Sequence, residues 1–98
     1  MNVTYIENNS ELNKLRKTQK KTKERTLLLF VSLWDKASEN LLKNIEKSKK
    51  RKNVYVVNTF DVPHSTSIFK INKLPALVHL KDKTSVEDYL PHIYDRLV

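Results

Sequence analysis

Apolar residues occur in short runs that are separated by polar, lysine-rich stretches. Residues 26–32 are almost continuously apolar over the length of one strand, which is typical of a strand buried on both faces. Residues 3–6 and 53–58 are rich in β-branched side chains and also predict strands. Residues 76–80 predict a further strand, and residues 84–86 predict an edge strand. We therefore expect four or five strands.

Helical spacing of apolar residues appears in the segments between these strands. Residues 10 to about 22 and 37 to about 50 each predict a helix, and residues 65–71 predict a short one. We expect Ser10 and Ser65 to be the N-caps of the first and third of these helices. The end of the chain predicts a last helix, with one apolar face made of Tyr89, Leu90, Ile93, Tyr94 and Leu97.

The alternation of strands and helices predicts one α/β domain, residues 1–98, with a mixed sheet covered by helices on both faces. The N-terminal residues lack the pattern of a signal peptide. The longest apolar run is far shorter than the roughly 20 residues that cross a membrane. We therefore expect a cytoplasmic protein without a membrane span.

The chain contains neither cysteine nor glycine among its 98 residues. Without cysteine it has no disulfide, no cysteine-ligated metal site and no thiol nucleophile. Without glycine it has no P-loop and no dinucleotide-binding fingerprint. His64, His79 and His92 lie on different predicted elements, so we expect no metal site and no cofactor. Backbone with positive φ is expected at Asn8, Asn9, Asn53, Asn72 and Asp82.

Three landmarks follow one another along the chain. Residues 30–34, Phe-Val-Ser-Leu-Trp, end the central apolar strand, and residues 56–62 form a strand with an acidic exit. Residues 68–78 contain Leu74 and Pro75 directly before another strand. This order resembles thioredoxin-fold proteins, in which a buried strand ends in an aromatic residue and leads into Trp-Cys-x-x-Cys at the start of a helix. The resemblance implies a thioredoxin-like fold, a four- or five-stranded mixed sheet flanked by helices, and a cis bond before Pro75.

The two cysteine positions of that motif are occupied by Asp35 and Ser38 in this chain. Disulfide exchange needs one thiolate to attack and a second thiol to resolve the mixed disulfide, and a carboxylate and a hydroxyl do neither. We therefore expect a redox-inactive protein that is not an enzyme. Asp35 at the start of a helix is typical of an N-cap, which stabilises a helix by about 1 kcal/mol. The alternative is a role of Asp35 in binding a partner.

In the resembling fold, the helix start and the cis-proline loop form an exposed groove that suits extended peptides. We therefore expect an interaction or adaptor module that binds an unidentified protein partner at this groove. Trp34 either packs in the core or lies on the surface as an aromatic anchor. The expected partner surface consists of Trp34, Asp35, Lys36, Ser38, Leu74, Pro75 and Ala76.

Basic residues give the chain a formal net charge of +8 and gather in two blocks. If the topology is as expected, both blocks converge at the pole opposite Trp34 and Pro75. Such a pole attracts nucleic acid or another polyanion, without sequence specificity because lysine predominates. The alternative function is thus an accessory protein of nucleic acid or a polyanion, unless the charge is only solvated surface or compositional bias. The expected basic pole consists of Lys14, Arg16, Lys17, Lys20, Lys21, Lys23, Arg25, Lys47, Lys49, Lys50, Arg51 and Lys52.

Overall fold

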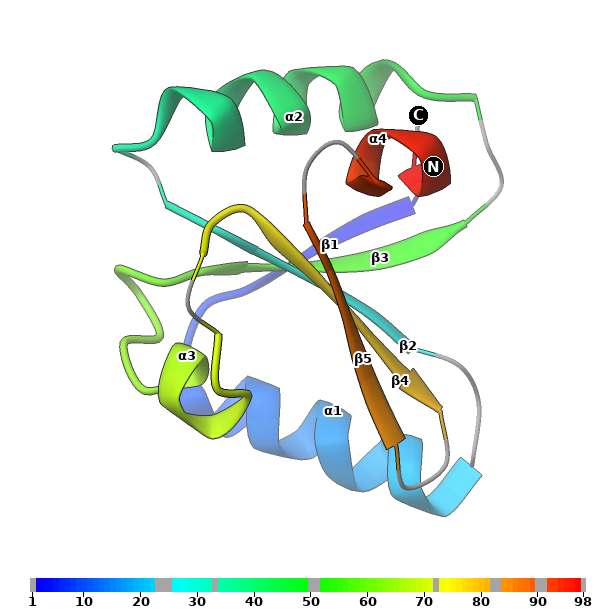
Figure 1. The fold of residues 1–98 in the computed structure, drawn as a ribbon. Helices are drawn as coiled ribbons and strands as arrows, with labels where there is room; N and C mark the ends of the chain where they lie inside the picture. The colour runs from blue at the N-terminus through cyan, green and yellow to red at the C-terminus, as the bar shows by residue number, and fades with distance from the viewer. Residues whose placement is uncertain are drawn as a thin grey trace.

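Strands and helices alternate along the chain, apart from a direct connection between the last two strands (Figure 1). The structure is a computed structural model, and it describes residues 2–22, 26–32, 34–49, 52–71, 73–81, 84–89 and 92–97. The elements are β1 (Asn2–Ile6), α1 (Asn9–Thr22), β2 (Thr26–Val31), α2 (Lys36–Lys47), β3 (Asn53–Asn58), α3 (Ser65–Ile68), β4 (Ala76–Lys81), β5 (Thr84–Tyr89) and α4 (His92–Leu97).

The described strands form one five-stranded sheet in the order β1-β3-β2-β4-β5. β1, β3 and β2 run parallel to one another, whereas β4 runs antiparallel to β2 and β5 antiparallel to β4. Every residue of the central strand β2 is buried. The mixed sheet and its buried central strand confirm the sequence prediction, and the physical reason is that β2 has neighbours on both sides and helices over both faces.

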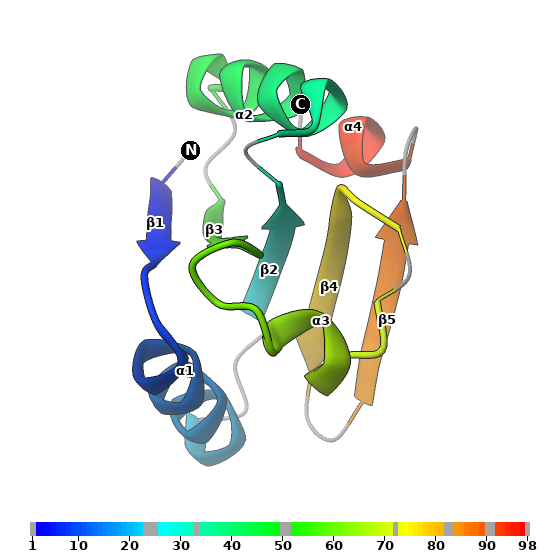
Figure 2. The ribbon, with the colours of Figure 1, turned by 90° about the vertical axis from the view of Figure 1, so that its left-hand side faces the viewer.

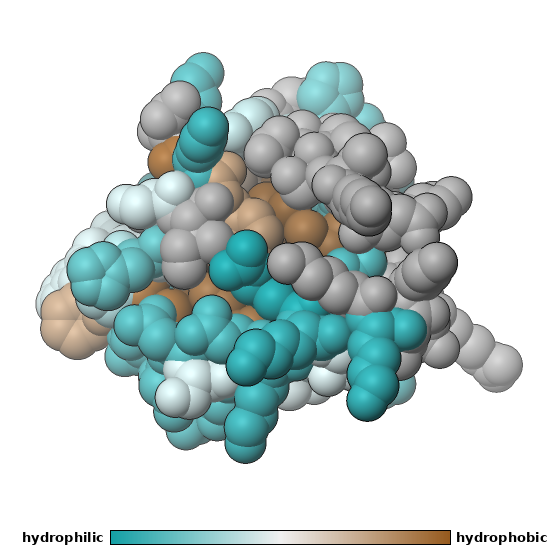
Figure 3. Space-filling view, turned by 90° about the horizontal axis from the view of Figure 1, so that it is seen from below, coloured by the Kyte–Doolittle hydropathy of each residue, from teal (hydrophilic) through white to brown (hydrophobic). Residues whose placement is uncertain are grey.

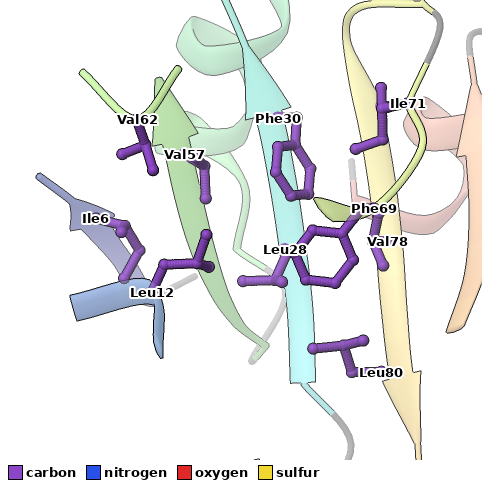
Figure 4. Packing of buried hydrophobic residues seen from close by; sticks show 11 residues of the cluster. Ile6, Leu12, Leu28, Phe30, Val57, Val62, Phe69, Ile71, Val78 and Leu80 are labelled. Carbon is purple, nitrogen blue, oxygen red and sulfur yellow. The ribbon is translucent and has the colours of Figure 1, made fainter. Parts of the chain in front are cut away.

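Alternating side chains of β2 contribute to two hydrophobic clusters, one on each face of the sheet. Leu28 and Phe30 lie in the cluster on the side of α1 and α3, where the ring centroid of Phe30 is 5.3 Å from that of Phe69 (Figure 4). Leu29 and Val31 lie in the cluster on the side of α2 and α4. The helices that close these clusters cover the sheet from above and below in Figure 1, as the α/β pattern predicts.

The N-cap of α1 is Asn8 and not Ser10, which lies within the first turn. The Oδ1 atom of Asn8 accepts a hydrogen bond of 2.9 Å from the backbone N–H of Glu11. The carboxylate of Glu11 in turn accepts one of 2.8 Å from the backbone N–H of Glu7. This reciprocal pairing resembles a capping box, which satisfies two backbone donors that a serine at position 10 would leave open.

The end of the chain does not form the single helical face that the apolar spacing predicts. Tyr89 belongs to β5, where it pairs with Ala76 of β4, and its side chain packs against the cluster of α1 and α3. Ile93 and Leu97 of α4 lie in the cluster on the other face. Pairing with β4 therefore overrides the local helical spacing, and Leu90 lies outside the described residues.

The helix α3 is shorter than expected, and its N-cap is also different. Ser65 is its first residue, and the buried Ser65 hydroxyl donates a hydrogen bond of 2.6 Å to the carbonyl of Val62. Lys70 has the one positive φ among the described residues, 55°, just after the end of α3, where a left-handed residue commonly closes a helix. None of the described asparagines expected to have positive φ does so, namely Asn8, Asn9 and Asn53, and Asn72 and Asp82 lie outside the described part.

Candidate partner-binding surface

Trp34 lies on a tight turn that directly follows β2. The Ser32 hydroxyl accepts a hydrogen bond of 3.3 Å from the backbone N–H of Trp34, and the Ser32 carbonyl accepts one of 3.2 Å from Asp35. These bonds hold the backbone of the turn while 85% of Trp34 remains exposed. Of the two alternatives left open by the sequence, the surface position of Trp34 is therefore the one the structure shows.

Asp35 and Ser38, at the two cysteine positions of the Trp-Cys-x-x-Cys motif, form a hydrogen-bond network with the end of β2. Asp35 is the N-cap of α2, because its Oδ1 accepts a bond of 3.3 Å from the backbone N–H of Ala37. Its Oδ2 accepts a bond of 2.9 Å from the Ser38 hydroxyl, whose oxygen accepts the N–H of Ser32 at 3.3 Å. The N-cap prediction is confirmed, and both side chains have structural hydrogen-bonding partners.

The segment before β4 lies at the same end of the sheet as Trp34, because Ala76 pairs with Phe30 near the end of β2. The peptide bond between Leu74 and Pro75 is cis. Leu74 is half-buried, whereas Pro75 and Ala76 are buried. Ser38 is buried as well, with none of its surface exposed. The exposed side chains of the expected partner surface are therefore those of Trp34 and Lys36, with Asp35 and Leu74 partly exposed.

A second exposed aromatic residue, Phe60, follows the neighbouring strand β3. Asn58 pairs with Val31 of β2, and the N–H of Thr59 donates a bond of 2.9 Å to the Val31 carbonyl, so the two strand ends are adjacent. The Asn58 Oδ1 accepts a bond of 3.1 Å from the N–H of Phe60, and its carbonyl accepts one of 3.0 Å from Asp61. This turn leaves 68% of Phe60 exposed. We call Trp34, Lys36, Phe60 and Leu74 the aromatic surface.

Sequence reasoning did not single out Phe60 as a contact residue. The available signal was an aromatic residue inside the turn Asn58–Asp61, where polar residues are usual and an asparagine holds the backbone. The two turns are built alike, because in each a side-chain oxygen at the strand end accepts the backbone N–H of the aromatic residue two positions later.

The ends of α1 and α2, which carry basic residues such as Lys21 and Lys47, lie at the other end of the sheet. α1 and α2 both end where β2 and β3 begin, away from the Trp34 turn, but they lie on opposite faces of the sheet (Figures 1 and 2). Seen from below, the side chains drawn over α1 are largely hydrophilic (Figure 3). The guanidinium of Arg16 is 5.4 Å from the centre of the Phe69 ring, so it also packs against the protein. The other described basic side chains of the expected pole are exposed: Lys14, Lys17, Lys21, Lys47, Lys49 and Lys52.

The remaining residues of the expected basic pole are described by their backbone alone or lie outside the described residues. Lys20 lies in α1 by its backbone, whereas Lys23, Arg25, Lys50 and Arg51 fall outside the described residues. Across the part that is described, no group of three or more histidine and acidic residues is arranged to hold a metal ion. None of the helices described is long and apolar enough to cross a membrane.

Comparisons with known proteins find similar solved structures but no similar sequence. No protein-family model and no curated protein matches the sequence. A reduced thioredoxin pre-protein of Schistosoma mansoni has a TM-score of 0.79 at 12% identity over 99% of this chain and 96% of its own. Fasciola hepatica thioredoxin reaches 0.72 at 18% identity over 100% of both chains. The fold is thioredoxin-like.

A thioredoxin of Malassezia sympodialis is also similar, with a TM-score of 0.74 at 13% identity over 99% of this chain and 91% of its own. At these identities the likeness shows the fold alone. The thioredoxin-like fold confirms the resemblance on which the sequence prediction rested. Since the chain has no cysteine, it also lacks the thiols that dithiol exchange requires.

Proposed function

We propose that this chain is a redox-inactive thioredoxin-fold module that binds a protein partner through the aromatic surface. The observation that carries the proposal is the pair of exposed aromatic residues on adjacent strand ends, Trp34 at 85% and Phe60 at 68% exposure. Large exposed aromatic side chains are favoured as anchors in protein interfaces, because each buries much apolar area in a partner pocket.

The hydrogen bonds at the two turns support the same function. A contact residue on a mobile loop must be ordered on binding, and this ordering weakens the interaction. Here the backbone N–H groups of Trp34 and Phe60 are already held by Ser32 and Asn58. Asp35 contributes by capping α2, and Ser38 and Pro75 by shaping the backbone, because their side chains are hydrogen-bonded or buried.

We further propose that the module acts as a single domain in the cytoplasm without catalysis or a cofactor. The Asp35–Ser38 pair supports a structural and not a catalytic role, because the Asp35 carboxylate accepts bonds from the Ser38 hydroxyl and from the Ala37 N–H at the start of α2, and Ser38 is buried. Cell fractionation tests the location, and it is independent of the binding test.

The binding test uses affinity capture from a lysate of the cells that express the protein, read by quantitative mass spectrometry. The double variant Trp34→Ala, Leu74→Asp removes the larger anchor and places a charge on the aromatic surface, so we expect partner capture to be abolished. The matched control is Asn13→Ala, an exposed residue of α1, and it should capture the same proteins as the natural chain. Circular dichroism must show that both variants are folded. Undiminished capture by the folded double variant would refute the proposal.

A second candidate function is binding of nucleic acid or another polyanion by the basic residues. It is favoured by one observation, namely that α1 and α2 both bring lysine-rich ends to the same end of the sheet (Figure 1). Placement on opposite faces would let a long polyanion contact both groups only by wrapping around that end of the molecule. Lysine contacts to phosphate are electrostatic and do not read bases.

Fluorescence anisotropy of labelled single- and double-stranded oligonucleotides tests this second function. We expect charge removal at Lys14, Lys17 and Lys21 to weaken binding, and charge removal at Lys47, Lys49 and Lys52 to weaken it similarly. A variant with Trp34→Ala should bind the oligonucleotide as the natural chain does. Absence of binding at low salt would leave these lysines as solvated surface.

A further inference from the structure

β1 is an edge strand with backbone groups that are directed out of the sheet. Among the described strands it pairs with β3 alone, in parallel. The N–H of Asn2 donates a bond of 2.9 Å to the carbonyl of Lys52, so Asn2 is directed toward β3. Since alternate residues of a parallel strand bond to the same neighbour, the N–H and C=O groups of Val3 and Tyr5 point away from the sheet.

This edge lacks the devices that usually protect an edge strand. Its sequence, Asn-Val-Thr-Tyr-Ile, contains no lysine and no proline, and valine, threonine, tyrosine and isoleucine all favour extended backbone. The free stretch ends at Glu7, whose N–H is already bonded at 2.8 Å to the Glu11 carboxylate. Val3 and Tyr5 therefore offer a short ladder of donors and acceptors to one additional strand.

A groove lies on the flank of α2 that reaches toward β1. Its volume is about 400 Å³, and it adjoins Tyr5, because the Tyr5 hydroxyl donates a bond of 3.0 Å to the Oε1 of Glu46 in the groove wall. The opposite flank of α2 faces α4, where Asn44 donates a bond of 3.3 Å to the Tyr94 hydroxyl. Figure 2 shows β1 at the outer side of α2, with α4 on the other side. The groove is lined by Ser32, Glu39, Leu42, Lys43 and Glu46.

The charges of this groove differ from those of the molecule as a whole. Glu39 is paired with Lys43 at 3.3 Å, whereas the contact found for Glu46 is the neutral Tyr5 hydroxyl. Burial and the neighbouring Glu46 raise the pKa of Tyr5, which keeps the hydroxyl protonated as a donor. Within the part of the chain that the structure describes, Glu46 therefore presents a carboxylate without a basic partner, beside the half-exposed ring of Tyr5, on a chain of net charge +8.

We propose that an extended segment of a partner protein adds to β1 as a further strand and places an arginine or lysine side chain in this groove. Bonds to the outward groups of Val3 and Tyr5 would supply affinity, and the groove would read every second side chain. The basic head group would meet the Glu46 carboxylate, and its stem would pack on the Tyr5 ring. This surface uses other residues than the aromatic surface and does not depend on it.

A second copy of the chain is a poorer occupant of the same edge. A symmetric antiparallel pairing would align Val3 of each copy with Tyr5 of the other and join only these two residues per chain. It would also bring together two molecules of formal net charge +8 each. A partner segment carrying one basic side chain suffers little of this repulsion and gains the contact with Glu46.

The test uses a labelled synthetic peptide, acetyl-Thr-Val-Thr-Arg-Thr-Val-Thr-amide, whose arginine and valines share one face of a strand. Its binding is measured by fluorescence anisotropy at low salt. Val3→Pro removes an outward donor without touching the ladder to β3, whereas the matched control Val3→Ala keeps that donor. We expect Val3→Pro to bind at least about tenfold more weakly than Val3→Ala. Amide hydrogen exchange at Thr4 must remain slow in both variants, as the check of folding.

Two further comparisons test the groove. Glu46→Gln keeps an acceptor for Tyr5 but removes the charge. It should therefore weaken binding of the arginine peptide about tenfold and leave binding of a leucine-containing peptide unchanged. Peptide binding should slow amide exchange at Val3 and Tyr5 in the natural chain. No binding at millimolar peptide, or equal binding by Val3→Pro and Val3→Ala, would overturn the proposal. So would sedimentation showing a dimer that Val3→Pro dissociates, because the occupant would then be a second copy.

Discussion

Where β2 and β3 end, two aromatic side chains project from turns held by hydrogen bonds, whereas at the opposite end exposed lysines lie near the ends of α1 and α2. The first arrangement fixes the backbone and exposes apolar area, so contacts there depend on shape and on removal of water. The second concentrates charge on long flexible side chains, so its contacts depend on counterions. Lysine near a helix C-terminus also stabilises the helix itself. The lysines thus have a structural role without any partner, and the exposed aromatic residues do not.

The largest expected difference between the two ends is their response to salt. Raising NaCl from about 50 to about 200 mM should weaken any oligonucleotide binding by the lysines on the order of a hundredfold, because each phosphate contact releases a counterion. Binding of a captured partner at the aromatic surface should change severalfold at most. Anisotropy titrations at both salt concentrations measure this. Partner binding that falls as steeply as oligonucleotide binding would remove the distinction between the ends.

The next effect concerns the network beneath the Trp34 turn. Ser38→Ala removes the acceptor of the Ser32 N–H and the donor to Asp35 in a buried position, so we expect it to lower the free energy of unfolding by about 1–3 kcal/mol. Urea denaturation measures the loss. The matched control is Ser67→Ala on α3, an exposed serine that should change stability by less than about 0.5 kcal/mol. Equal effects of the two changes would show that the network does not hold the turn.

Phe60→Ala separates a contact role from a structural one. Because most of the Phe60 side chain is exposed, we expect stability to change by less than about 0.5 kcal/mol and partner affinity to fall about tenfold. Phe69→Ala, at a buried position, should instead lower the free energy of unfolding by about 3–5 kcal/mol and leave the partner affinity of the folded protein unchanged. Partner affinity is measured by titration of the purified protein. Full affinity in the Phe60 variant would restrict the surface to the Trp34 turn.

The smallest effect is expected at Tyr5, an exposed aromatic residue that belongs to neither end. Burial and Glu46 raise its pKa above 10.0, so the protonated hydroxyl is favoured in the folded state. This contribution to stability is fully present below the unfolded pKa and is lost as pH rises through the higher folded pKa. The stability difference between the natural chain and Tyr5→Phe should therefore shrink on going from neutral pH to well above 10.0. Urea denaturation across this range would contradict the assignment if the difference stayed constant.

The sequence predicted the sheet and its order of elements because each strand is a distinct run of apolar or β-branched residues. It also predicted the N-cap at Asp35, since an aspartate directly before a helical pattern has few other local roles. It failed at Ser10 and Ser65 as N-caps, at the described asparagines expected to have positive φ, and at the end of the chain. The N-cap of α1 is Asn8, which lies two residues upstream of Ser10. At the end of the chain, the pairing of Tyr89 with Ala76 overrides a helical spacing.

Within the candidate site, exposure was harder to predict than position. The pattern placed Trp34 after a strand, but only the turn formed by Ser32 shows that it points outward. Phe60 was missed because its exposure depends on the Asn58 side chain and on the adjacency of β2 and β3. Such adjacency joins residues far apart in the sequence, so periodicity along the chain does not report it.

The most direct test of the aromatic surface follows Trp34 itself, because it is the one tryptophan in the chain. Incorporation of 5-fluorotryptophan gives this chain a single fluorine resonance, to which an unlabelled partner contributes no signal. Titration with a captured partner should shift and broaden the resonance and should protect it from a soluble paramagnetic probe. A partner that binds while the resonance stays unshifted and fully accessible would contradict the central claim.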